Sequence, residues 1–138
     1  MRAYVETSVL LRLILREPGA LEGLHSYETL VSSELSAVEA LRTIDRLRLQ
    51  GSLTTEEAAT RSGVVHEWLE AIDLVLVRPP ILSRAAEPLP VPLGTLDAIH
   101  LATALIWRDR KSEALAVTTH DAAFALAARA YGFEVVGA

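Results

Sequence analysis

The sequence contains no cysteine among its 138 residues. This absence excludes a disulfide framework, a thiolate zinc site and a thiol nucleophile, and it suits a reducing compartment such as the cytoplasm. Aromatic residues make up only 5% of the chain, so the core has to be built mainly from Leu, Val, Ala and Ile. No apolar run approaches the roughly 20 residues of a membrane span, and no signal peptide is apparent. We therefore expect a cytoplasmic protein with no membrane-bound segment.

Lysine is almost absent as well, since Lys111 is the only one and the other basic residues are arginines. The net charge of −5 excludes an overall attraction to nucleic acid or to anionic membranes. Acidic residues gathered in one site can nevertheless dominate this sum, and arginine binds phosphate in a bidentate manner. Arg42 and Arg46 lie one turn apart on a predicted helix. They are candidates for binding RNA phosphates, with a solvated helix face as an equally good interpretation.

The composition is that of a globular protein, with 51% hydrophobic and 22% charged residues, and residues 1–138 fit a single domain. Apolar segments typical of strands alternate with longer amphipathic segments. Strands are predicted at 3–7, 27–33, 73–79, 113–119 and 133–137. Helices are predicted at 8–17, 34–51, 53–72, 95–110 and 121–132, with brief ones at 20–26 and 81–87 and a proline-rich loop at 88–94. This alternation predicts an α/β fold, a three-layer α/β/α sandwich with a central parallel sheet.

Local signals predict where several of these elements begin and end. Thr7 or Ser8 is expected to cap the first helix, because short hydroxyl side chains are favoured caps. Thr54 and Glu57 have the spacing of a capping box at the start of 53–72. Pro79-Pro80 is expected to end the third strand.

Four acidic residues fall near predicted carboxyl ends of strands, although they are far apart in the sequence. Glu6 ends the first strand and Asp121 follows the fourth. Glu39 lies in the second turn of the helix after the second strand, and Asp97 lies in the first turn of 95–110. Open parallel sheets bind ligands beyond the carboxyl ends of their strands. We therefore expect these carboxylates to converge on one rim of the sheet.

Each acid also has a structural interpretation. Asp121 is a favourable helix cap, Asp97 complements the dipole of its helix, and Glu39 is spaced to pair with Arg42 at i+3. Glu6 is the hardest to explain in this way, because its two shorter hydroxyl neighbours are expected to cap the helix better.

A cluster of carboxylates is tolerated when its members surround a cation or share protons. Oxygen ligands without cysteine suit Mg²⁺ or Mn²⁺. Such ions lower the pKa of a bound water and neutralise charge during phosphodiester hydrolysis. The histidines complete no zinc pattern. His100 is expected to pack or to form hydrogen bonds within its helix, and His120 to lie at the rim.

Four stretches carry a resemblance to a known family: "YVETSVLLRLI" (4–14), "VSSELSAVEALRTI" (31–44), "LGTLDAIHLATAL" (93–105) and "VTTHDAAFALAARAYGFEVV" (117–136). In these stretches the chain resembles PIN-domain ribonucleases, in particular the toxin subunits of VapBC-type toxin–antitoxin pairs. The resemblance implies an α/β/α fold, Mg²⁺ or Mn²⁺ as cofactor, and tRNA, rRNA or mRNA as substrate. It also implies a cognate antitoxin as partner, a homodimer, and products with a 5′-phosphate and a 3′-hydroxyl.

The resemblance also implies roles for individual residues. Metal ligands would be Glu6, Asp97 and Asp121, with Glu39 as the fourth acid of the catalytic site. Ser8 and Thr119 would support the site through hydrogen bonds.

The sequence departs from the family pattern at its first acid, where "ETS" replaces the usual "DTS" or "DAS". Glutamate is one methylene longer than aspartate, and Mg²⁺ tolerates little error in a coordination shell of about 2.0–2.1 Å. Two functions follow: an active endoribonuclease, or a PIN-like binding module with weak or no nuclease activity because of Glu6. A phospho-receiver domain is excluded, because "LVLVRPP" (74–80) ends without an aspartate and Lys111 precedes a late strand.

Overall fold

The computed structural model describes all residues 1–138 and contains one central sheet of five strands. The strands are β1 (Arg2–Val5), β2 (Thr29–Ser33), β3 (Ile72–Val75), β4 (Leu115–Thr118) and β5 (Val135–Val136). All neighbouring pairs run parallel, in the order β3-β2-β1-β4-β5. The predicted parallel sheet is therefore confirmed.

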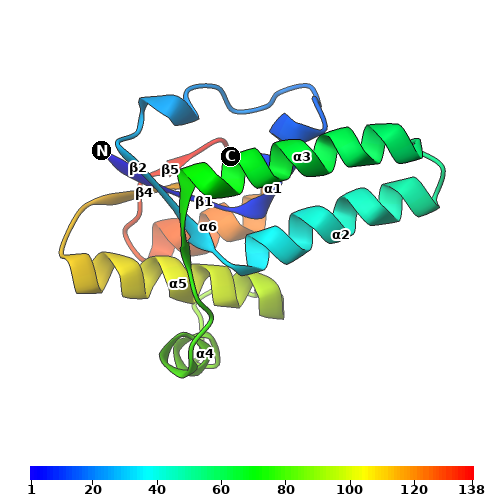
Figure 1. Cartoon of the computed structure of the whole chain (residues 1–138). Coiled ribbons are helices and arrows are strands. Elements are labelled where there is room, and N and C mark those ends of the chain that lie inside the picture. The colour runs from blue at the N-terminus through cyan, green and yellow to red at the C-terminus, as the bar shows by residue number, and fades with distance from the viewer.

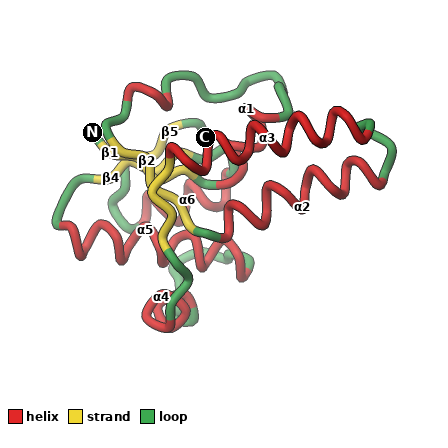
Figure 2. The backbone as a smooth tube through the Cα atoms, viewed as in Figure 1, coloured by secondary structure: helices red, strands yellow, loops and turns green.

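Helices cover both faces of this sheet, as Figure 1 and Figure 2 show. They are α1 (Thr7–Ile14), α2 (Leu35–Leu49), α3 (Thr55–Ala71), α4 (Pro79–Ala85), α5 (Thr95–Lys111) and α6 (Ala122–Ala130), with a 3₁₀ turn at Leu24–Ser26. Helices α1, α2 and α3 pack on one face and α5 and α6 on the other, while α4 lies against α5. The predicted three-layer α/β/α sandwich is confirmed. No helix has both the length and the apolar character that crossing a membrane requires.

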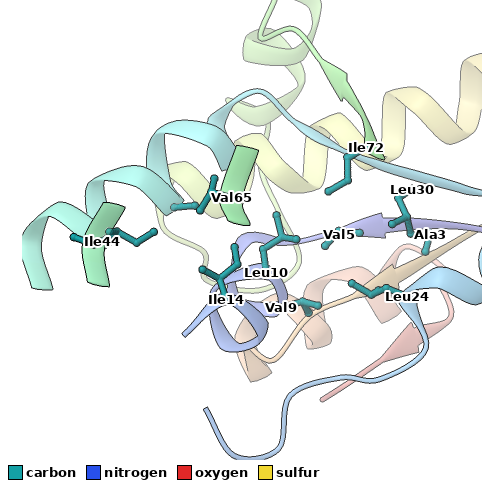
Figure 3. Packing of buried hydrophobic residues seen from close by; sticks show 12 residues of the cluster. Ala3, Val5, Val9, Leu10, Ile14, Leu24, Leu30, Ile44, Val65 and Ile72 are labelled. Carbon is teal, nitrogen blue, oxygen red and sulfur yellow. The ribbon is translucent and has the colours of Figure 1, made fainter. Parts of the chain in front are cut away.

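Alternation along β1 divides the core into two clusters. Ala3 and Val5 point to one face and pack with Leu10 of α1 and Val65 of α3 (Figure 3). Tyr4, between them, points to the opposite face and packs among residues of α5 and α6. Successive side chains of a strand project to opposite faces, so a continuous apolar run is buried on both sides of the sheet.

The third strand is shorter than its sequence predicts. β3 ends at Val75, and Pro79-Pro80 opens α4 instead of closing the strand. Proline is favoured in the first turn of a helix because its fixed φ suits the helix and its missing N–H needs no partner there. The segment after β3 is held by Glu34, whose carboxylate accepts a hydrogen bond from the Val77 N–H.

The cap of α1 also differs from the prediction. Glu6, and not Thr7 or Ser8, is the N-cap; its backbone is extended, and its carboxylate accepts a 2.6 Å hydrogen bond from the Ser8 N–H. The Thr7 hydroxyl is engaged elsewhere, so it does not compete for this position. The capping box of Thr54 and Glu57 at the start of α3 is confirmed.

The strand order changes direction between β1 and β4. The chain runs outward from β1 through β2 to β3, and then crosses to the other side of β1 to form β4 and β5. Glu6 N–H donates a 3.0 Å hydrogen bond to the Thr118 carbonyl, so the two strands stay paired to their carboxyl ends. Ligands bind at such switch points in open α/β sheets. The residues just after β1 and β4 therefore occupy the expected position of a functional site.

Candidate active site

Glu6 occupies the centre of a hydrogen-bond network at this switch point. It is only 5% exposed, and both of its carboxylate oxygens are engaged. Oε2 accepts from the Ser8 N–H at 2.6 Å, and Oε1 accepts from the Ser8 and Thr119 hydroxyls, each at 2.8 Å. A buried carboxylate needs such donors, because burial without them disfavours its charged form. The longer glutamate side chain thus folds back onto the start of its own helix.

The turn between β4 and α6 is attached to the same network. Thr119 Oγ1 accepts from the Asp121 N–H at 3.0 Å, and the His120 N–H donates to Ser8 Oγ at 3.0 Å. Asp121 caps α6 by accepting a 2.8 Å hydrogen bond from the Phe124 N–H through Oδ1. The capping role that the sequence allowed for Asp121 is therefore confirmed. It leaves the second carboxylate oxygen of Asp121 without a hydrogen bond.

The segment after β5 closes against this turn. Gly137 has a φ of +102°, and a Cβ placed on it would lie 2.6 Å from the Thr119 carbonyl oxygen. Its own carbonyl lies 3.0 Å from His120 Nδ1. Only glycine fits here without strain, because other residues rarely adopt positive φ and the side chain has no room. The backbone at Gly137 therefore fixes the position of the Thr119–Asp121 turn.

Asp97 shows that the acids lie near one another. It sits in the first turn of α5 and is partly buried. Burial, followed by the charges of Glu6 and Asp121, raises the pKa of Asp97 to about 6; Glu39 adds to this and His100 opposes it. Charges are screened less in a partly buried site than in water. The other three predicted acids therefore all disfavour the charged form of Asp97 at the start of α5.

Glu39 lies at the edge of the group, with a side chain that is 25% exposed. Its Oε1 lies 2.6 Å from His100 Nε2 and accepts a 3.0 Å hydrogen bond from the Thr7 hydroxyl. Burial raises the pKa of Glu39, but the hydrogen bond and charge of His100, with the Thr7 hydroxyl, outweigh it, so the pKa lies below its ordinary value. The suggested pairing of Glu39 with Arg42 is wrong, because Arg42 pairs with Asp45 at 3.0 Å.

A family model and two sequence relatives identify the family of this chain. The family model described as "PIN domain" matches residues 3–136. The chain belongs to the PIN-domain family. It is 35% identical over 105 residues to Ribonuclease VapC46 of Mycobacterium tuberculosis (strain ATCC 25618 / H37Rv). This match covers 73% of this chain and 72% of that protein. It is 30% identical over 138 residues to Ribonuclease VapC47 of Mycobacterium tuberculosis (strain CDC 1551 / Oshkosh), covering 94% and 92% respectively.

Solved structures agree on the fold. A chain of a toxin–antitoxin complex from Klebsiella pneumoniae superimposes with a TM-score of 0.62 at 19% identity, covering 89% of this chain and 90% of that one. At this identity the likeness establishes the fold alone. The family model and the two sequence relatives confirm the predicted resemblance to VapC-type PIN proteins.

The carboxylate oxygens of the four acids are the type of ligand that a hard divalent cation prefers. The acids supply oxygen ligands only. Burial, and after it the charges of the other acids, disfavour the charged form of Asp97, and a bound cation favours that form. The Asp97 carboxylate has no hydrogen-bond partner to hold it. No three Asp, Glu or His side chains already form a cation site. Asp97 is therefore the acid that is freest to turn toward a metal.

Two features of this PIN domain have no counterpart in the sequence prediction. Tyr4 and Thr7 both contact His100, which is 1% exposed; the Tyr4 hydroxyl lies 2.6 Å from His100 Nδ1. The available signal was a tyrosine within an otherwise apolar strand. The second feature is an apolar cavity of about 470 Å³ between α4, the proline-rich loop and the start of α5. Its walls include Leu82 and Leu89.

Proposed function

We propose that this chain is a metal-dependent endoribonuclease, the toxin of a type II toxin–antitoxin system, and that Glu6, Glu39, Asp97 and Asp121 form its catalytic site. The observation that carries the proposal is the raised pKa of Asp97, to about 6, caused by burial and by the charges of the other three acids at the sheet's switch point. Membership of the PIN family and the curated relatives named ribonucleases support the same activity.

The proposed ligands of Mg²⁺ or Mn²⁺ are Glu6, Asp97 and Asp121. When bound, the cation would lower the pKa of a water and neutralise charge on the scissile phosphate. The chain's own contribution is the placement of its acids. Ser8 and Thr119 hold Glu6 through hydrogen bonds. Hydrolysis by water without a covalent intermediate then leaves a 5′-phosphate and a 3′-hydroxyl.

The partners proposed are an RNA substrate (tRNA, rRNA or mRNA), a cognate antitoxin and a second copy of the chain, all in the cytoplasm. The apolar cavity supports a protein partner, because Leu82 in its wall is 47% exposed. Leu96, in the first turn of α5, is 49% exposed. Exposed apolar surface of this kind marks interaction sites. Arg42 and Arg46 are exposed on α2 and are proposed to contact RNA phosphates. We also propose that residues 1–138 form a single PIN domain.

The deciding experiment is cleavage of total RNA by the purified chain with Mg²⁺ or Mn²⁺, with and without EDTA. We expect cleavage that EDTA abolishes and that Asp97→Asn lowers by at least about 10²-fold, because metal-assisted hydrolysis depends on its ligands. Asp109→Asn is the matched control, since Asp109 is an exposed acid at the other end of α5. Equal rates for the native chain and Asp97→Asn would disprove the assignment of the site.

A binding module without nuclease activity is the second candidate. The observation that favours it is the full engagement of the Glu6 carboxylate by Ser8 and Thr119, which leaves this acid little freedom to bind a metal. The two functions predict different results for Glu6→Asp. An inert native chain whose Glu6→Asp variant cleaves RNA would identify the binding module. Cleavage by the native chain identifies the nuclease.

A further inference from the structure

A buried chain of polar groups runs from the middle of the sheet to the acidic rim. It begins at Tyr4 on β1, passes through His100 on α5 and ends at Glu39 on α2. Both contacts are 2.6 Å long, and Tyr4 and His100 are 0% and 1% exposed. The imidazole ring of His100 therefore connects a strand of the sheet, β1, to helix α2 on the opposite face of the sheet.

The imidazole is held by its neighbours as well as by hydrogen bonds. The ring of Tyr4 lies edge-on to His100 at 5.9 Å between centroids, and the ring of Phe124 lies edge-on at 6.5 Å. Edge-to-face pairs of this kind are favourable and restrict ring rotation. His100 therefore presents its two nitrogens in fixed directions.

The direction of the hydrogen bonds follows from the chemistry of the ends. A carboxylate only accepts, so His100 Nε2 carries the proton that is donated to Glu39 Oε1. In the neutral imidazole Nδ1 is then the acceptor, and the Tyr4 hydroxyl can donate to it at 2.6 Å. A phenol keeps its proton near neutral pH. In this tautomer each group donates toward the rim.

All hydrogen bonds to the Glu39 carboxylate reach the same oxygen. Oε1 accepts from His100 and from the Thr7 hydroxyl, whereas Oε2 accepts none. The side chain is 25% exposed, and Oε2 keeps its capacity to accept. This is the arrangement expected of an acid that is oriented by one oxygen and acts through the other.

We propose that Tyr4 and His100 are positioning residues that orient Glu39, so that its free Oε2 faces the other acids of the site. The inference rests on the proposed nuclease function and deepens it, because it assigns the placement of one catalytic acid to two buried residues that do not touch substrate. Thr7 is the third group that holds the same oxygen. The role differs from simple core packing, because its effect passes through Glu39 alone.

A double-mutant cycle tests this dependence. Misplacing a catalytic group by about 1 Å can cost about 10²-fold in rate. We expect His100→Leu to lower kcat by about that factor with KM unchanged, and His100→Gln to recover much of the loss, because its amide can donate to Glu39. The double variant with Glu39→Gln should be no slower than Glu39→Gln alone. The proposal would be overturned if the fold losses in kcat of the two single variants multiplied in the double variant. It would also be overturned if His100→Leu kept the native kcat.

A second measurement needs no cleavage. In ¹⁵N-histidine NMR, His100 should be protonated at Nε2 and unprotonated at Nδ1. Tyr4→Phe should shift the Nδ1 signal and Glu39→Gln the Nε2 signal, whereas His66→Gln, on the exposed surface of α3, should shift neither. If the native chain cleaves no RNA but these signals appear, the proposed function fails and the anchoring of Glu39 stands. A proton on Nδ1 instead of Nε2 would overturn the anchoring whatever the cleavage result.

Discussion

Thr119 donates a 2.8 Å hydrogen bond to Glu6 although 113 residues separate them in the chain. This contact joins the residue that ends β1 to the turn that follows β4. Both of its atoms are buried, and Ser8 reinforces it from the start of α1. The shape of the acidic rim therefore depends on hydroxyl groups as much as on the acids themselves.

Removing the Thr119 hydroxyl should uncouple these two segments. We expect Thr119→Val to lower the free energy of unfolding by about 1–3 kcal/mol, because it leaves a buried carboxylate oxygen short of a donor. RNA cleavage should fall as well. Thr103→Val is the matched control, since Thr103 is also buried but donates only to the Ile99 carbonyl of its own helix. Chemical denaturation and cleavage assays compare the two variants. Equal loss of activity in both would show that the site does not depend on the Thr119 hydrogen bond in particular.

Asp97→Asn should make the metal-free protein more stable while it abolishes cleavage. The pKa of Asp97 is raised from 3.8 to about 6 on folding, so the folded state binds more protons between these values. Stability therefore falls as pH rises from about 4 to about 6, and the cost persists above that range. The asparagine variant escapes this cost, which we place at about 1 kcal/mol after allowing for solvent screening.

Denaturation in EDTA at pH 4 and pH 8 measures this effect. The difference between native protein and Asp97→Asn should be small at pH 4 and about 1 kcal/mol in favour of the variant at pH 8. Asp109→Asn should show no such dependence, because Asp109 is exposed. A variant that is less stable than the native chain at pH 8 would mean that the other acids do not repel Asp97.

The two candidate arginines of α2 should contribute unequally to RNA binding. Arg42 already pairs with Asp45 at 3.0 Å, whereas Arg46 is exposed and has no acidic partner within 4.0 Å. We expect Arg46→Gln to lower the slope of log affinity against log salt by about one unit, and Arg42→Gln to change it less. Binding of single-stranded RNA to the Asp97→Asn background over a range of salt concentrations measures both. Indistinguishable slopes for Arg46→Gln and the parent would exclude this face of α2 from RNA binding.

Gly137→Ala should disturb the Thr119–Asp121 turn from the segment that follows the edge strand β5. The new Cβ would lie 2.6 Å from the Thr119 carbonyl oxygen at a φ of +102°, so the turn has to move. We expect a loss of about 1–3 kcal/mol in the free energy of unfolding. Gly63→Ala is the opposite control, because Gly63 lies within α3 with open space around it. This variant should raise the free energy of unfolding by about 0.5–1 kcal/mol. Thermal unfolding of both variants checks the pair, and an unchanged Gly137→Ala would show that the turn is not confined.

Local patterns in the sequence account for most of the fold. Alternating strand and helix signals predicted the parallel sheet and located the carboxyl ends of β1 and β4 to within about two residues. The rule that ligands bind beyond the carboxyl ends of parallel strands then predicted that the acids converge there. The prediction failed at Pro79-Pro80, because a proline pair stops a strand and starts a helix equally well. It failed at Glu6 because capping preference favours short side chains, and nothing local showed that the Thr7 hydroxyl is engaged with Glu39.

The contacts of His100 mark the limit of such reasoning. The sequence indicated that His100 packs or forms hydrogen bonds, but its partner Tyr4 lies 96 residues away. Hydrogen bonds over such separations are set by how the layers stack, which periodicity along one segment does not encode. The apolar cavity could not be predicted either, because it forms where α4 and the proline-rich loop meet α5.

The pairing of β1 with β4 has a consequence for how the protein is made. Glu6 is synthesised more than 100 residues before its partners Thr118 and Thr119. Until they emerge, β1 lacks one neighbour in the sheet and the acids have nothing to gather around. A nascent chain, or one truncated before this turn, is therefore expected to carry no assembled acidic rim. The topology delays the assembly of the rim until the turn between β4 and α6 has been synthesised.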